Sequence, residues 1–154
     1  MAAAAAFAAD LFLHLPITDM FDGLAARLGF FLYDRILESA FALLGAATLI
    51  VVATWRKRSR LLLLAAALLV AVTVPVERLL LVSSVENIHY PQYALLAFLL
   101  GCSGLSTEAS WLGATGLGAL DEGYQYLFLP RGRPTYLDWN DIVLNAIGAG
   151  FGIV

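Results

Sequence analysis

The stretch DEGYQYLFLPRGRPTYLDWNDIVLN, from Asp121 to Asn145, places charged and amide side chains between two apolar segments. Ionisable groups are costly inside a bilayer, so they normally face partners or a water-filled cavity. The apolar segments on either side both resemble helices, and the stretch therefore predicts a polar site between packed helices. The polar side chains that it contributes are Asp121, Glu122, Gln125, Arg131, Arg133, Asp138, Asp141 and Asn145.

The composition of the whole chain is typical of a membrane protein. Of its 154 residues, 61% are hydrophobic and only 14% are charged, and the mean hydropathy is +0.83. Soluble domains are roughly 45–50% apolar and about 25% charged. The net charge of −3 gives no reason to expect nucleic acid as a partner. Neither His14 nor His89 has metal-ligand spacing with the single cysteine, Cys102, so we expect no metal and no cofactor.

Five apolar segments predict an all-α fold, a polytopic transmembrane helical bundle. We expect four full spans and a short fifth C-terminal helix, at about residues 36–55, 61–82, 91–105, 108–129 and 141–154. The fifth, at ~1.5 Å per residue, is shorter than the ~30 Å hydrocarbon core. Residues 1–22 are expected to form a loose or interfacial N-terminal segment, and residues 23–154 the transmembrane domain.

The basic loop RKRSR, residues 56–60, sets the expected orientation. It holds four of the nine basic residues and should therefore be cytoplasmic. Counting crossings from this loop places residues 83–91 and 130–140 toward the outer face. The candidate polar site then gathers on that face and comprises Glu86, His89, Asp121, Glu122, Gln125, Arg131, Arg133, Asp138, Asp141 and Asn145.

Helical spacing refines this candidate site. Asp121 and Glu122 lie four and three residues before Gln125, so either acid shares a helix face with the amide. Another polar stripe follows in the fifth segment, formed by Asp138, Asp141 and Asn145. We expect Arg133 or Arg131 to pair with these carboxylates. Small residues at four-residue spacing predict close helix packing at Ala114, Gly118, Gly148 and Gly152.

Two stretches together resemble the VanZ-like family of small bacterial membrane proteins. They are ENIHYPQYALLAFLL (residues 86–100) and LDEGYQYLFLPRGRPTYLDWNDIVLNAIGAGFG (residues 120–152). The positions that carry the likeness are Glu86, His89, Tyr93, Asp121, Glu122, Gln125, Arg133, Asp138, Asp141, Asn145 and Gly148. The resemblance implies a protein of the bacterial cytoplasmic membrane, from a family whose founding member is associated with resistance to the glycopeptide teicoplanin. The staggered arginines of PRGRP leave two candidates for the family arginine, of which we favour Arg133.

These observations favour a small integral membrane protein of the cell envelope that is not an enzyme. Its polar cluster is either structural or a binding site for a lipid or cell-envelope headgroup, so membrane lipid is the expected partner. One alternative is an accessory or scaffold subunit of a larger bacterial complex, for example a respiratory or photosynthetic one. A second is an intramembrane acid/base enzyme acting on an envelope lipid, with Glu86, Glu122 and His89 as acid and base. No activated Ser or Cys nucleophile motif is present, so we assign no catalytic residue.

Overall fold

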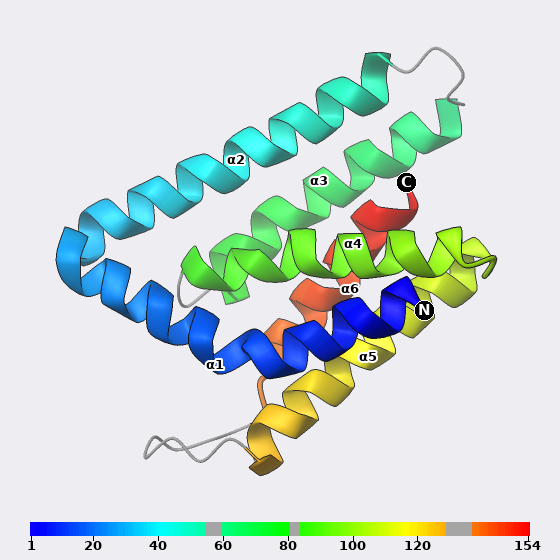
Figure 1. The fold of residues 1–154 in the computed structure, drawn as a ribbon. Helices are drawn as coiled ribbons and strands as arrows, with labels where there is room; N and C mark the ends of the chain where they lie inside the picture. The colour runs from blue at the N-terminus through cyan, green and yellow to red at the C-terminus, as the bar shows by residue number, and fades with distance from the viewer. Residues whose placement is uncertain (55–59, 81–83, 129–136) are drawn as a thin grey trace. The chain divides into compact units, whose positions relative to one another are not determined.

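The computed structural model describes residues 1–54, 60–80, 84–128 and 137–154, and every regular element in these residues is a helix (Figure 1). Within these helices, the side chains at 10, 12–15, 18, 48, 49, 51–53, 60, 62, 84 and 85 lie outside the description. The elements are α1 (Ala2–Leu28), α2 (Phe30–Thr54), α3 (Arg60–Leu80), the 3-10 helix η1 (Ser84–Ile88), α4 (His89–Cys102), α5 (Thr107–Phe128) and α6 (Trp139–Ile153). The prediction of an all-α fold is confirmed.

The prediction of four full membrane spans with a short fifth helix is wrong. Among the described residues, one helix is long and apolar enough to cross a membrane, α3 over Leu63–Leu80. Helix α4 has 14 residues and α6 has 15, so at ~1.5 Å per residue they reach only about 21 to 23 Å. Helix α5 has 22 residues, but Glu108, Asp121 and Glu122 interrupt its apolar sequence.

Contacts divide the chain into two compact units, which we describe separately. Unit 1 comprises Met1–Phe12 and Ile88–Ile153, and unit 2 comprises Leu13–Asn87 with Val154. In unit 2, helices α2 and α3 run antiparallel beside each other (Figure 1). Residues 1–22, expected to be loose or interfacial, lie within α1 and its preceding residue.

Unit 1 is built on a tight turn between α4 and α5. Gly104 has φ +97°, a left-handed conformation that glycine adopts without steric cost and that ends the preceding helix. Two residues later, the Ser106 hydroxyl accepts a hydrogen bond from the Ala109 N–H at 3.2 Å and caps the start of α5. Because the connection is short, α5 returns antiparallel to α4.

Helix α6 packs against both α4 and α5, and its glycines allow the close approach (Figure 1). A Cβ atom on Gly148 would lie 2.8 Å from the carbonyl oxygens of His89 and Tyr90, and one on Gly152 would collide with the Ala94 carbonyl. The small buried residues Ala97, Ala114 and Ala149 line the same core. This packing brings the start of α4, the end of α5 and the start of α6 to one end of the bundle.

Candidate functional site

Three side chains from three different helices meet at this end of unit 1. His89 begins α4, Glu122 lies in the last two turns of α5, and Asp141 lies in the first turn of α6. The Nε2 atom of His89 is 3.5 Å from Oδ1 of Asp141. One potential ligand atom from each of the three side chains lies within 4.8 Å of the other two. The set joins residues up to 52 positions apart, and only helix packing brings them together.

Gln125 connects the two acids of α5, as the helical spacing predicts. Its Nε2 donates to Oδ2 of Asp121 at 3.1 Å and to Oε1 of Glu122 at 3.3 Å. Tyr93 on α4 donates its hydroxyl to the same Asp121 oxygen at 3.4 Å. Tyr93, Asp121 and Glu122 are all buried, with Asp121 only 1% exposed. These hydrogen bonds hold both carboxylates in place inside the bundle.

The electrostatics of the cluster favour proton exchange near neutral pH. Burial, reinforced by the neighbouring carboxylate of Asp141, raises the pKa of Glu122 to about 8, although His89 acts in the opposite direction. Burial lowers the pKa of His89, but the surrounding carboxylates of Asp141, Glu122 and Asp121 outweigh it and leave that pKa above its usual value. Glu122 is therefore largely protonated at pH 7 unless a cation binds beside it.

The polar stripe predicted on α6 separates into three different roles. Asp138 Oδ1 accepts a hydrogen bond from the Asn140 N–H at 2.9 Å and caps the helix. Asp141 faces His89. Asn145 is fully buried against Gly118, where an added Cβ would lie 2.7 Å from its Nδ2, and neither of its amide atoms has a hydrogen-bond partner within the described residues.

The remaining predicted site residues are not placed in this cluster. Glu86 belongs to η1 and to unit 2, so we include it in no site with unit 1. Arg131 and Arg133 lie outside the described residues, as does most of the basic loop at 56–59. The predicted pairing of Arg133 with a carboxylate therefore stays a prediction.

Sequence reasoning missed polar residues at the other end of α5. Trp111 donates its Nε1 to the Ala146 carbonyl of α6 at 2.9 Å. Ser110 is buried, and its hydroxyl has no hydrogen-bond partner within the described part of the chain. Ser110 lies four residues before Ala114 and eight before Gly118. This helical spacing could have placed Ser110 on the buried face of α5.

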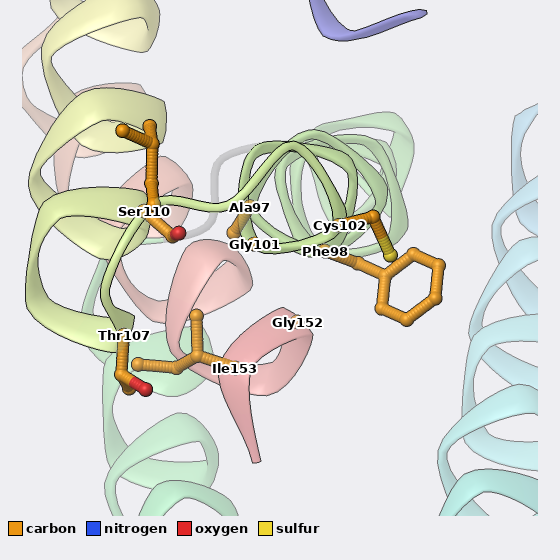
Figure 2. Close-up of a pocket in the computed structure, with 9 residues that line it drawn as sticks. Ala97, Phe98, Gly101, Cys102, Thr107, Ser110, Gly152 and Ile153 are labelled. Carbon is orange, nitrogen blue, oxygen red and sulfur yellow. The ribbon is translucent and has the colours of Figure 1, made fainter.

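A shallow cavity of about 300 Å³ lies at this second end, far along the bundle from His89. The ends of α4 and α6 and the start of α5 line it. In Figure 2 the Ser110 hydroxyl points toward α4 at Gly101, while Phe98 and Cys102 lie on the side of α4 away from Ser110. The cavity brings together no ionisable cluster among its lining residues. We therefore take the cluster of His89, Glu122 and Asp141 as the candidate functional site.

Comparison of the chain with protein-family models, with curated proteins and with solved structures gives no match.

Proposed function

We propose that the protein is a small, membrane-embedded protein of the VanZ-like kind, located in the bacterial cytoplasmic membrane, and that its site in unit 1 binds the polar headgroup of an envelope lipid. One observation carries the proposal. Buried acids and His89 meet at one end of a bundle whose outward faces are apolar.

Large exposed apolar side chains support a membrane environment. On α3, Leu61 is 78% exposed and Leu79 is 81% exposed, and only 6% of the candidate span Leu63–Leu80 is buried. On α5, Leu120 and Leu127 are also exposed. Many large apolar side chains exposed on one helix favour a membrane or protein contact surface, because exposing them to water is unfavourable.

The chemistry of the site favours a headgroup with hydrogen-bond donors. The described cluster contains the carboxyl groups of Asp121, Glu122 and Asp141 but neither lysine nor arginine. Ionised carboxylates only accept hydrogen bonds, and they bind ammonium groups more strongly than neutral donors. An ammonium or hydroxyl group of a lipid headgroup therefore suits the cluster better than a bare phosphate.

Native mass spectrometry of the protein released from mild detergent tests this proposal. We expect the wild-type chain to retain one phosphatidylethanolamine in preference to phosphatidylglycerol, and Asp141→Asn to lose that preference. Glu108→Gln is the matched control, because Glu108 is an exposed acid on the same helix as Glu122. Equal retention of both lipids by the wild type and by Asp141→Asn would contradict a headgroup site.

A second candidate, an acid/base enzyme acting on an envelope lipid, is favoured by the raised pKa of Glu122. A carboxyl group whose pKa is about 8 is suited to donate a proton near neutral pH, and His89 stands beside it. Incubation of the purified chain with radiolabelled envelope lipids tests this candidate. It requires a product that disappears in Glu122→Gln and persists in Glu108→Gln.

A further inference from the structure

The described residues of unit 1 carry more carboxyl groups than cationic groups. Ligand atoms of His89, Glu122 and Asp141 lie within 4.8 Å of one another, and Gln125 donates hydrogen bonds to both Asp121 and Glu122. The described residues of unit 1, 1–12, 88–128 and 137–153, contain no lysine or arginine, so His89 is their one basic side chain. Carboxylates gathered in a poorly solvated place must be neutralised by protons or by a bound cation.

The geometry around His89 favours a metal ion as that cation. His89 is nine-tenths buried, and its Nδ1 has no hydrogen-bond partner within the described residues. Oδ1 of Asp141, 3.5 Å from the other ring nitrogen, is buried and likewise accepts no hydrogen bond from them. A buried carboxylate oxygen left in this state costs free energy, and a cation bound between Asp141 and the Nε2 side of His89 would satisfy it.

The spacing of the three side chains is close to that of a metal site. Nitrogen and oxygen ligands lie about 2.0–2.2 Å from Zn²⁺, so two ligands of a tetrahedral site are about 3.4 Å apart. The ligand atoms of His89, Glu122 and Asp141 lie within 4.8 Å of one another. The largest of these separations exceeds the tetrahedral spacing by at most about 1.4 Å, a difference that side-chain rotations can close while the helix backbones stay in place.

We propose that His89, Glu122 and Asp141 bind a divalent transition-metal ion, Zn²⁺ or Mn²⁺, with at least one coordination position left open. One imidazole with two carboxylates suits these ions, whereas Mg²⁺ and Ca²⁺ favour ligand sets made of oxygen alone. Gln125 then acts as a positioning residue, because it holds the Glu122 carboxylate. The inference does not rest on lipid binding, since a metal ion can occupy the cluster whether or not a headgroup does.

Equilibrium dialysis with metal analysis tests the proposal on the full chain in detergent, purified without a histidine tag and stripped with EDTA. We expect about one equivalent of Zn²⁺ or Mn²⁺ per chain, little Mg²⁺, and a higher unfolding temperature with the metal. Glu122→Gln and Asp141→Asn should each weaken binding by about 100-fold. Glu108→Gln and Cys102→Ser should leave it unchanged, because both residues are exposed and lie away from the cluster.

Cobalt substitution in the unaltered protein keeps the test decisive if a variant fails to fold. Bound Co²⁺ should give the visible absorption of a site with nitrogen and oxygen ligands and no thiolate charge-transfer band. A thiolate band would assign the metal to Cys102 and overturn the proposal. Failure of the wild-type chain to bind any of these ions would also overturn it, and would mean that protons alone neutralise the carboxylates.

Discussion

At the scale of single residues, close approach of backbones decides which positions tolerate a side chain. Gly148 and Gly152 contact the backbone of α4, and Gly118 contacts Asn145, whereas Gly116 has open space around it. The small-residue spacing in the sequence indicates which glycines pack, but not which backbone each one meets. That pairing depends on the rotation of α6 against α4, which no local pattern encodes.

Gly148→Ala should lower the free energy of unfolding by about 1–3 kcal/mol, because the new Cβ would stand 2.8 Å from two backbone carbonyl oxygens of α4. Gly116→Ala on α5 is the control. It should be neutral or stabilising by up to about 1 kcal/mol, since nothing lies within 4 Å of its Cβ position. Thermal unfolding in detergent measures both. Equal unfolding temperatures for the two variants would mean that α6 does not pack on α4 as described.

Among the helices, the positions of α2 to α6 could be predicted from the sequence, whereas α1 and the number of spans could not. The expected segments at 91–105, 108–129 and 141–154 correspond to α4 at His89–Cys102, α5 at Thr107–Phe128 and α6 at Trp139–Ile153, because turn-forming and charged residues delimit each apolar run. The error was to count every apolar run as a crossing. Two of these helices are too short, and α5 carries buried acids on one face.

The grouping of the candidate site at one end of the bundle could be predicted from the sequence, and so could the bonds from Gln125 to Asp121 and Glu122, but the contact of His89 with Asp141 could not. Alternating helix directions place the polar residues of α4, α5 and α6 at one end, and the sequence alone is enough for that inference. The expected pairing of Arg133 or Arg131 with the carboxylates stays a prediction, while the structure adds a contact between His89 and Asp141 that the sequence did not predict. Which residue faces an acid depends on helix register and side-chain rotamer, and these follow from packing rather than from spacing.

Trp111→Phe tests the contact between α5 and α6. It removes the hydrogen bond from Nε1 to the Ala146 carbonyl, so stability should fall by about 0.5–1.5 kcal/mol. Trp139→Phe is the matched control, because Trp139 is 68% exposed and should change stability by less than about 0.5 kcal/mol. Both can be measured by urea or thermal unfolding in the same detergent. A larger loss for Trp139→Phe would contradict the described pairing of the helices.

At the scale of the whole molecule, the exposed apolar surface and the acidic site require different surroundings. Leu43, Leu61 and Leu79 in unit 2 are exposed, while Asp121 and Glu122 in unit 1 are buried. A chain that is 61% hydrophobic can satisfy both if lipid or another protein covers the apolar faces and the helices of unit 1 enclose the acids. Mass measurement after mild detergent extraction distinguishes a surface covered by lipid from one covered by another protein. An accessory subunit would remain in a large stoichiometric complex.

Reporter fusions test the expected orientation in the membrane. A reporter inserted after Arg58 should read cytoplasmic, because the basic residues at 56–60 favour that side, and one inserted within 131–136 should read periplasmic. Crossing of the membrane by α3 alone is enough to separate the two positions. If both reporters read the same side, the chain makes no net crossing of the membrane between Arg58 and residues 131–136.

Alkaline carbonate extraction of bacterial membranes tests whether the protein is embedded in a lipid bilayer, as we propose. We expect the wild-type chain to stay in the membrane pellet at high pH and high salt and to be released only by detergent. Peripheral proteins are released by the same treatment because their electrostatic contacts are lost. Recovery of the folded chain in the supernatant without detergent would mean that the protein is not embedded in the bilayer.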